Sequence, residues 1–467
     1  MAKGKVYLVG AGPGDAELIT LKGCRLIAQA DVIIHDRLIP MELLRLARAD
    51  AEVISVGKFA GKHTLAQDKI NALLVEKAAD NRIVVRLKGG DPYLFGRGGE
   101  EAQACAEAGI EFEVVPGITS ALAGPAYAGI PPTHRDYTSN VAIVTGHRKE
   151  EADLEIPKAG TLIFLMGVAN IAKIIHSLLR AGYSNQTRIA AVEKGTCYEQ
   201  RVIIGRLDDF LEKVRREQLR TPAVFIVGRV VELSEKLNWF SKKPRILLPG
   251  THPDKYQHLG TIVHRPLIKC VGLSDYTEAD KVLKNAGAFD WLVFTSTNGA
   301  RFFFERLNAL GLDARAFGAA KVAAIGKTTA EKLRTFGILA DIQPKLESSV
   351  GLLEEFGKVD VKGKRILLAR PKVGPSTLVD SLKNIGARPE CVVVYENVEN
   401  EPEEVDFEFI DQVLFTSGST VRAFIKRYGP VPAGKKVYCL GRPTMAEAQK
   451  HNIQAEILPE KRRPVPD

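Results

Sequence analysis

Two glycine-rich turns in the first quarter of the chain each end in an aspartate. The longer one begins RLKGGDPYLFGRGGEE at Arg86 and puts Asp91 directly after two glycines, Gly89 and Gly90. The other reads GAGPGD and ends at Asp15. Glycine lets a ligand come close to the backbone, and a carboxylate beside it accepts hydrogen bonds from hydroxyl or amine groups. Two such turns in one lobe favour a site for a small polar cofactor.

Strands followed by helices must position these turns. Apolar strand-like runs alternate with helical patterns along most of the chain. This alternation predicts an α/β fold with mostly parallel sheets. The expected strands are Val6–Val9, Val32–Ile34, Val84–Leu87, Phe112–Val115, Val141–Thr145, Leu162–Met166 and Ala223–Val227, and the clearest helical segments are Leu65–Ala78 and Gly99–Ala108.

Length and composition indicate a globular protein of several domains. The 467 residues could form roughly three domains of ordinary size. Hydrophobic residues at 45% and charged residues at 26% exclude large-scale disorder. No run of 18 apolar residues occurs and the chain starts in a strand, so we expect neither signal peptide nor membrane span. Six scattered cysteines without a CxxC pair predict a cytoplasmic protein with no disulfide or metal framework.

The net charge of +9 is compatible with nucleic acid or with a small polyanionic substrate. No Lys/Arg-rich tract with interleaved aromatic residues occurs, and the motifs of the usual nucleic-acid readers are missing. Arginines inside the motifs, such as Arg86, Arg97 and Arg135, suit a carboxylate, because guanidinium binds it with two parallel hydrogen bonds. We therefore expect a small anionic substrate and no nucleic-acid partner.

The first turn partly matches a dinucleotide-binding fingerprint. Gly10 and Gly12 follow a strand, and Asp36 stands about where a ribose-binding acid would be. The third glycine is displaced, however, and Asp15 would repel a pyrophosphate. Pro13 also removes a backbone donor from the loop. An NAD-dependent oxidoreductase is thus a disfavoured alternative.

The chain changes character at Asn238–Pro244 and then repeats itself with an offset of about 120 residues. We place a domain boundary there. The repeat predicts two similar α/β lobes around a cleft, with a Thr-Ser pair where a strand gives way to a helix; such pairs hold ligands or cap helices. The repeated segments are Arg245–Leu248 with Arg365–Leu368, Val293–Ser296 with Leu414–Ser417, and Ala324–Thr329 with Cys439–Thr444.

Seven motifs occur in order in the first half: Val6–Asp15, His35–Ile39, Val56–His63, Arg86–Glu101, Val114–Ala121, Thr133–Asp136 and Thr145–His147. Together they resemble those of uroporphyrinogen-III C-methyltransferase, a class III S-adenosylmethionine-dependent methyltransferase of tetrapyrrole synthesis. The resemblance runs to about Phe240 and implies two α/β subdomains, about 1–117 and 118–241, with S-adenosylmethionine between them. It also implies a homodimer.

The same resemblance implies roles for individual residues. Asp36 and Lys58 would exchange protons with the substrate. The cofactor site would contain Pro13, Gly89, Gly90, Asp91, Leu94, Thr119, Ser120, Met166 and Gly195. Arg37, Arg86, Arg97, His134 and Arg135 would meet the eight carboxylates of the tetrapyrrole. The sequence departs from the family pattern at His35, Ser120 and Pro132, and none of these changes removes a reactive group.

The second half, 243–467, contains the two-lobe repeat and four further motifs: Phe294–Gly299, Val392–Glu396, Phe415–Thr420 and Leu440–Ala448. These resemble uroporphyrinogen-III synthase, which closes hydroxymethylbilane to uroporphyrinogen III. The resemblance implies lobe one at about 245–267 plus 398–460 and lobe two at about 270–395. It also implies that Tyr395 and Thr444 would assist departure of the substrate hydroxyl, and that Ser296, Ser417 and Ser419 would hold carboxylates. One departure, the segment PGTHPD after the strand at 245, lacks the arginine usual there.

The leading hypothesis is a bifunctional enzyme that closes hydroxymethylbilane and methylates uroporphyrinogen III twice to precorrin-2. The alternative keeps the methyltransferase and makes the second half a non-catalytic tetrapyrrole-binding module. The sequence does not separate sirohaem from cobalamin as the end product, nor does it show whether the intermediate passes directly between the halves.

Overall fold

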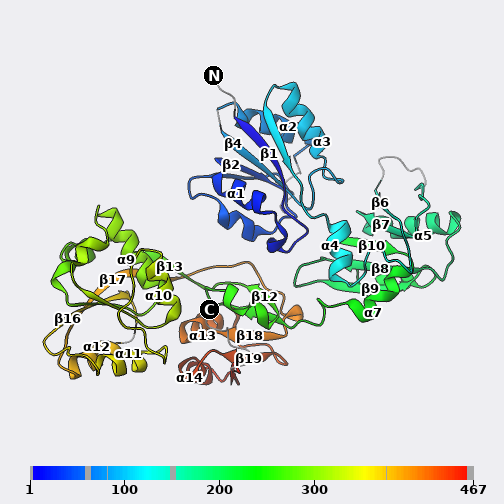
Figure 1. The fold of residues 1–467 in the computed structure, drawn as a ribbon. Coiled ribbons are helices and arrows are strands. Elements are labelled where there is room, and N and C mark those ends of the chain that lie inside the picture. Colours follow the sequence, from blue (N-terminus) through cyan, green and yellow to red (C-terminus); the bar gives the residue numbers. More distant parts are fainter. Residues whose placement is uncertain (1–3, 58–64, 81, 148–153, 375, 460–467) are drawn as a thin grey trace. The chain divides into compact units, whose positions relative to one another are not determined.

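The computed structural model describes residues 4–57, 65–80, 82–147, 154–374 and 376–459. The chain divides into two compact units, Met1–Lys243 and Pro244–Asp467, and each contains two five-stranded sheets (Figure 1). Within these described ranges, no helix has the length and apolar character needed to cross a membrane.

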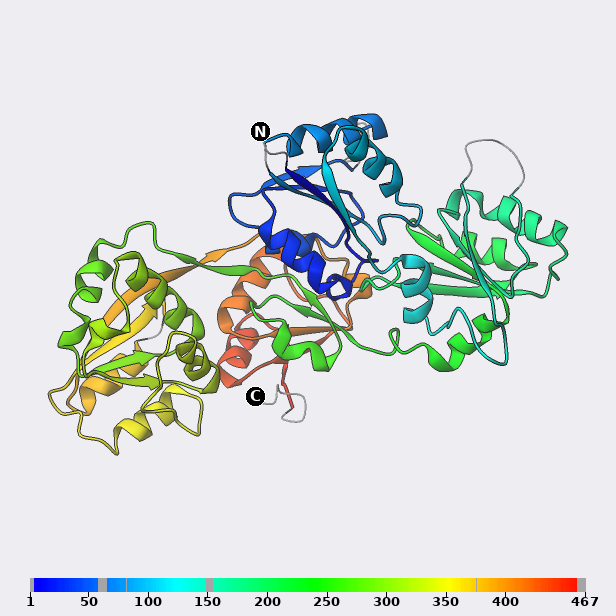
Figure 2. The same ribbon diagram turned by 45° about the horizontal axis from the view of Figure 1, so that its top comes forward.

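The first sheet has the order β3-β2-β4-β1-β5 and is parallel throughout. Helix α1 packs on one face and helices α2 and α3 on the other (Figure 2). Burial on both faces explains the continuous apolar runs of the central strands. The elements are β1 Lys5–Gly10, α1 Leu21–Gln29, β2 Val32–His35, β3 Glu52–Ser55, α2 Gln67–Ala78, β4 Ile83–Lys88, α3 Gly98–Glu107 and β5 Glu111–Val115.

Strand β4 lies between β1 and β2, whereas a dinucleotide-binding sheet keeps its first two strands adjacent. The strand order therefore argues against the oxidoreductase alternative. It also brings the turn after β4 beside the turn after β1, although about 80 residues separate them in the chain.

The second sheet, ordered β6-β7-β10-β8-β9, is the exception to the expected mostly parallel sheets. Only β6 and β7 are parallel; the other three pairings are antiparallel. The short connection between β8 and β9 accounts for the direction of that pair, because parallel neighbours need a crossover of a dozen or more residues. The elements are α4 Ser120–Tyr127, β6 Val141–Thr145, β7 Thr161–Leu165, α5 Ile171–Arg180, β8 Arg188–Glu193, β9 Arg201–Arg206, α6 Phe210–Arg216, β10 Ala223–Val227 and α7 Ser234–Leu237.

The second unit begins and ends in one sheet, ordered β12-β11-β18-β19-β20, in which all pairings are parallel. The residues between β12 and β18 form the other sheet. The elements of the first of these sheets are β11 Arg245–Leu248, β12 Thr261–His264, β18 Gln412–Phe415, α13 Gly418–Tyr428, β19 Lys436–Cys439, α14 Arg442–Lys450 and β20 Glu456–Ile457.

The inserted sheet has the order β13-β17-β16-β14-β15, with α8, α9 and α10 on one face and α11 and α12 on the other (Figure 1). Its only antiparallel pairing joins β13 to β17, the strands by which the chain enters and leaves. The elements are β13 Ile268–Gly272, α8 Thr277–Leu283, β14 Trp291–Phe294, α9 Thr297–Ala309, β15 Lys321–Ala324, α10 Lys327–Arg334, α11 Ser349–Phe356, β16 Arg365–Pro371, α12 Thr377–Asn384 and β17 Arg388–Glu399.

The predicted duplication is confirmed at the strand ends. Ser296 caps α9 after β14, and Ser417 caps α13 after β18. Each serine hydroxyl accepts a hydrogen bond from a backbone N–H in the first turn of its helix. Both Thr-Ser pairs therefore act as helix caps, whatever else they bind.

Candidate active sites

The turns after β1, β4 and β5 meet backbone to backbone. Gly12 and Gly90 exchange two hydrogen bonds, with N···O distances of 3.3 and 2.7 Å. Both have positive φ, +81° and +69°, which glycine adopts without strain. A Cβ on Gly10 would lie 2.6 Å from the Gly90 carbonyl oxygen, and one on Gly117 would lie 2.2 Å from it. Only glycines fit where these turns meet. We call the contact of Gly10, Gly12, Gly90 and Gly117 the glycine crossing.

Asp91 links two of the turns that form the glycine crossing through hydrogen bonds to their backbone. Its Oδ1 accepts hydrogen bonds from the backbone N–H groups of Tyr93 and Leu94, at 2.8 and 3.0 Å. Its Oδ2 accepts from the N–H of Gly117 at 3.0 Å. The carboxylate therefore orders the turns after β4 and β5, a role that the motif alone did not indicate.

A turn of the second subdomain contacts the GPGD loop. The backbone N–H of Asp15 donates to the Thr196 hydroxyl at 3.0 Å, and the Tyr127 hydroxyl donates to the Asp15 carboxylate at 2.8 Å. Burial raises the pKa of Tyr127, and Asp15 adds to the effect, so the phenol stays protonated. A Cβ on Gly14 would lie 3.3 Å from the Gly195 carbonyl oxygen. The predicted cofactor residues Pro13 and Gly195 thus belong to adjoining turns.

Three more predicted cofactor residues, Thr119, Ser120 and Leu94, lie around these turns. Thr119 caps α4, and its Cα lies 3.8 Å from where a Cβ of Gly90 would be; Ser120 is next to it. Leu94 packs against the core of the second sheet. Met166 follows β7 instead of ending it and is 53% exposed, so it is not the core residue that its neighbours suggest.

Backbone conformation marks the same loops. Seven non-glycine residues of the described chain have positive φ, and five of them lie in loops that carry predicted cofactor or substrate residues. Such conformations cost about 1–3 kcal/mol each and gather at functional sites. None of the five has a residue type that favours positive φ, so the sequence did not predict their backbone conformation. The five are Phe95, Arg97, Met166, Lys194 and Thr196.

Asp36 lies at the carboxyl end of β2, beside the glycine crossing. Its carboxylate is 34% exposed, and its Oδ1 accepts a hydrogen bond from Nη2 of Arg86 at 2.5 Å. The following loop reaches the turn after β4, because a Cβ on Gly89 would lie 2.7 Å from the Leu38 carbonyl oxygen. A partly exposed acid therefore stands next to the proposed cofactor turns.

Arg86 has a different place from the one expected for a substrate-binding residue. Its side chain is 2% exposed, and its Nε donates to Oε1 of Glu101 at 2.9 Å. Side chains alternate along β4, so Arg86 shares the face of Val84, which α2 and α3 cover. We therefore assign Arg86 to holding Asp36 rather than to contact with the substrate.

The remaining predicted residues of the first unit are scattered. Arg37 and Arg135 are exposed, and Arg97 pairs with Glu100 at 3.1 Å. His134 lies between α4 and β6, where its ring packs edge-on against Tyr137. The described contacts do not join His134 or Arg135 to Asp36 or to its partner Arg86. The predicted proton-exchanging residue Lys58 lies outside the described residues.

In the second unit the predicted residues fall on two sheets. Tyr395 lies in β17, stacks on Phe302 at 5.4 Å and has its hydroxyl 3.4 Å from the Ser296 hydroxyl. Burial raises the pKa of Tyr395. The other sheet carries Ser417 and Ser419, whose hydroxyls are 2.9 Å apart. It also carries Thr444, buried at the start of α14.

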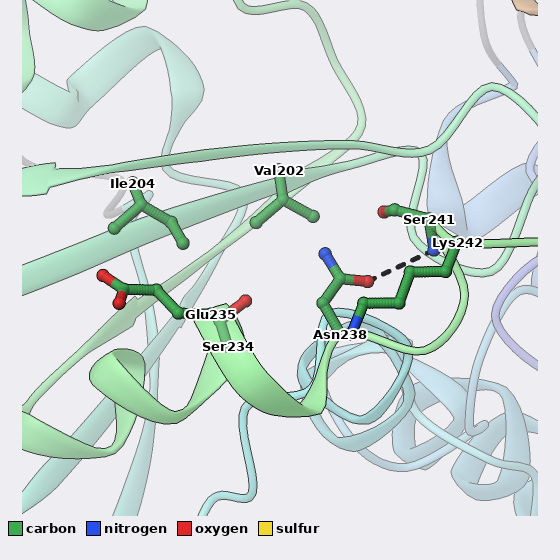
Figure 3. A pocket seen from close by; sticks show the side chains of 7 residues that line it. All are labelled: Val202, Ile204, Ser234, Glu235, Asn238, Ser241 and Lys242. Atoms are coloured by element: carbon green, nitrogen blue, oxygen red, sulfur yellow. Dashed lines mark hydrogen bonds between the residues drawn. The ribbon is translucent and has the colours of Figure 1, made fainter.

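A separate hollow of about 280 Å³ lies beside β9 and α7 (Figure 3). Within it, the Asn238 side-chain oxygen accepts a hydrogen bond from the Ser241 N–H at 3.2 Å. The hollow contains none of the predicted site residues. Its lining consists of Val202, Ile204, Ser234, Glu235, Asn238, Ser241 and Lys242.

Comparison with known proteins covers both units. Residues 5–211 match the model of the Tetrapyrrole (Corrin/Porphyrin) Methylases, and residues 255–464 match that of Uroporphyrinogen-III synthase HemD. "Porphyrin biosynthesis protein HemD" of Ruminiclostridium josui is 36% identical over an alignment of 482 positions, gaps included. The alignment covers 97% of this chain and 95% of the relative. The chain belongs to both families, a tetrapyrrole methylase followed by a uroporphyrinogen-III synthase. The predicted fusion, its α/β folds and its two enzyme classes are confirmed.

The methylase half has further relatives. Uroporphyrinogen-III C-methyltransferase of Priestia megaterium is 50% identical over 237 residues, half of this chain and 100% of the relative. A crystal structure of uroporphyrin-III-C-methyltransferase from Thermus thermophilus is 41% identical and covers 50% of this chain and 96% of its own, with a TM-score of 0.44.

The cysteine thiols should differ in how fast they are alkylated, depending on their burial. Burial raises the pKa of Cys197 in the methylase half to about 12 and that of Cys439 in the synthase half to about 11. Both therefore stay as unreactive thiols at pH 8, whereas Cys391 is exposed. We expect iodoacetamide to label Cys391 at least about tenfold faster, as read by peptide mass spectrometry. Equal rates in the folded protein would contradict these burial assignments.

Proposed function

We propose that the methylase half uses S-adenosylmethionine to methylate uroporphyrinogen III twice, giving precorrin-2, and that the synthase half makes this uroporphyrinogen III from hydroxymethylbilane. One observation carries the proposal for the first half: Asp36, held by a buried arginine, stands beside the glycine crossing at the carboxyl edge of a parallel sheet. Ligands of open α/β sheets gather at this edge.

The residues present suit the cofactor. The crossing of Gly10, Gly90 and Gly117 offers backbone groups without side chains, and a Cβ on Gly90 would meet nothing closer than 3.8 Å. The adjoining turns at Pro13 and Gly195, together with Thr119, would complete the site. When bound there, S-adenosylmethionine would supply an electrophilic methyl group.

The protein's own groups would then position the substrate and move protons. Methylation makes the pyrrole carbon quaternary, so the macrocycle has to release a proton from another position. Asp36 would accept that proton, a step that contributes about 10²–10⁴-fold in enzymes. The exposed Arg37, Arg97 and Arg135, with His134, would bind substrate carboxylates, in keeping with the net charge of +9. Orientation of the two reactants would supply most of the remaining acceleration.

In the synthase half, Tyr395 would donate a hydrogen bond to the departing hydroxyl. Burial keeps its phenol protonated, and the Ser296 hydroxyl is its neighbour. The first turns of α9 and α13, with their serine caps, would hold substrate carboxylates, because a helix N-terminus favours negative charge.

Full-length protein tests both activities in one experiment. With hydroxymethylbilane alone we expect the type III isomer on chromatography, and adding S-adenosylmethionine should give a product heavier by two methyl groups. Only the spontaneous type I isomer would make the second half a non-catalytic binding module. Type III isomer with no gain in mass would eliminate the methylation proposal.

Tyr395→Phe should slow synthesis of the type III isomer by about tenfold, because it removes one hydrogen bond from a reaction that depends mainly on holding the bilane. The initial rate with hydroxymethylbilane measures it. Tyr428→Phe is the matched control, because Tyr428 is the last residue of α13 and is not among the predicted site residues. Equal rates for both variants would remove Tyr395 from the reaction.

We also propose that the protein is a homodimer through its methylase half. Large apolar side chains are exposed on α4 and on the loops near the glycine crossing, among them Leu38, Ile118 and Leu122. Sedimentation velocity of the full chain measures the state directly, and a monomer at micromolar concentration would contradict the proposal.

A further inference from the structure

Glu101 is a buried carboxylate to which the reaction described so far gives no role. It lies in α3 with a fully buried side chain. Its Oε1 accepts hydrogen bonds from Arg86 Nε at 2.9 Å, Lys88 Nζ at 3.0 Å and Gln67 Nε2 at 3.3 Å. These donors come from β4 and α2, so one oxygen atom joins three elements.

The sequence explains how these charges come together. Arg86 and Lys88 are two residues apart in β4 and so point to the same face of the sheet. On α3, Glu101 precedes the buried Ala102, which packs on that face. Both cations are 2% exposed, and burial lowers the pKa of Lys88. Since buried charges are costly unless paired, Glu101 and Asp36 balance the two cations.

Among the four charged residues of this cluster, Asp36, Arg86, Lys88 and Glu101, only Asp36 reaches solvent. Arg86 presents its Nε to Glu101 and its Nη2 to Asp36, so a single rigid guanidinium plane joins a buried carboxylate to a partly exposed one. Holding Glu101 in place therefore fixes where Arg86, and through it Asp36, can lie. A lysine at position 86 would keep the charge but could not join both groups in a fixed plane.

Stability alone does not account for the cluster. Replacing a buried ion pair with apolar residues of similar size is often neutral or stabilising. The second oxygen of Glu101 is buried and has no hydrogen-bond partner among the described residues, so the carboxylate is only half satisfied. Burying a half-satisfied carboxylate costs stability. The orientation that Glu101 imposes on the Arg86 guanidinium explains the cluster better than stability does.

We propose that Glu101 is a positioning residue for methyl transfer: it anchors the Arg86 guanidinium so that Asp36 is held at the angle required for proton transfer. The inference rests on the proposed function of the methylase half. Glu101 itself touches neither substrate nor cofactor in this scheme.

Two double variants of the full-length protein separate positioning from stability. In Lys88→Met/Glu101→Met the buried pair is replaced by apolar side chains and Arg86 loses its anchor. In Lys88→Met/Glu101→Gln the charge balance is the same, but a neutral oxygen can still accept from Arg86 Nε. The measurements are Tm, S-adenosylhomocysteine affinity by calorimetry, and kcat and KM for methylation of uroporphyrinogen III.

We expect both variants to keep Tm and S-adenosylhomocysteine affinity close to those of the wild type. The Met/Met variant should lose kcat by about 10- to 100-fold with KM little changed, as for a small misplacement of a catalytic group. The Met/Gln variant should recover most of that loss. Glu107→Gln, an exposed position on the same helix, controls for loss of one carboxylate.

Wild-type kcat in the folded Met/Met variant would overturn the proposal. Equal losses in both double variants, together with lost S-adenosylhomocysteine binding or a much lower Tm, would show that the cluster is structural. Failure of the proposed function is a distinct result, because the wild-type protein itself would then leave uroporphyrinogen III unmethylated.

Discussion

We expect Asp36→Asn to lower kcat for methylation by roughly 10²- to 10⁴-fold, the usual contribution of a general base, and to leave S-adenosylhomocysteine binding intact. The amide has the size of the carboxylate and can still accept a hydrogen bond from Arg86, so the fold and the glycine crossing should persist. What is lost is the ability to take a proton. Steady-state kinetics with uroporphyrinogen III and calorimetry with S-adenosylhomocysteine measure the two effects separately.

Asp80→Asn serves as the control for this substitution, because Asp80 is exposed in the turn after α2 and its loss changes the net charge equally. A kcat within about threefold of the wild type in Asp36→Asn would exclude Asp36 as the base. Loss of S-adenosylhomocysteine binding would instead make Asp36 part of the cofactor site.

Gly117→Ala should weaken S-adenosylhomocysteine binding by about 10- to 100-fold, which corresponds to about 1.4–2.8 kcal/mol. The new Cβ would lie 2.2 Å from the Gly90 carbonyl oxygen and 2.7 Å from the Gly10 Cα, and both are backbone atoms that cannot swing aside. The crossing must then open. Overpacking of this kind also lowers the free energy of unfolding by about 1–3 kcal/mol.

For Gly99→Ala we expect no loss of S-adenosylhomocysteine affinity or of stability. A Cβ there would meet no atom within 4 Å, and Gly99 lies in α3, where alanine is favoured over glycine by up to about 1 kcal/mol. Gly99→Ala should keep S-adenosylhomocysteine affinity and match or exceed wild-type stability in urea. Equal affinity for the two variants would mean that the glycine crossing does not form the cofactor site.

Local pattern was enough to predict most strands and several individual roles. Apolar runs gave seven strands of the first half, because burial on two faces leaves a continuous hydrophobic signature. The repeated Thr-Ser pairs predicted the strand-to-helix junctions that Ser296 and Ser417 cap. The motifs also identified both families, since their order along the chain is a property of sequence alone.

The same patterns predicted mostly parallel pairing, which holds for three of the four sheets but not for the second, and they did not predict the burial of several side chains. The second sheet is mostly antiparallel, because direction depends on how the chain returns and not on strand composition. Met166, next to an apolar strand, is exposed with φ of +56°, a conformation its residue type does not indicate. The patterns also gave no sign that Asp91 bonds to backbone amides or that Arg86 bonds to another buried side chain.

The amino-acid sequence by itself determined the kinds of chemistry available: glycine turns, an acid after β2, and serine caps at two strand ends. Tertiary structure decided which of these groups meet. Strand β4 inserts between β1 and β2, so Arg86 and Lys88 become central and buried, and helix α3 must supply the carboxylate that neutralises them. The strand order that buries these charges follows from long-range packing, which no local window of residues contains.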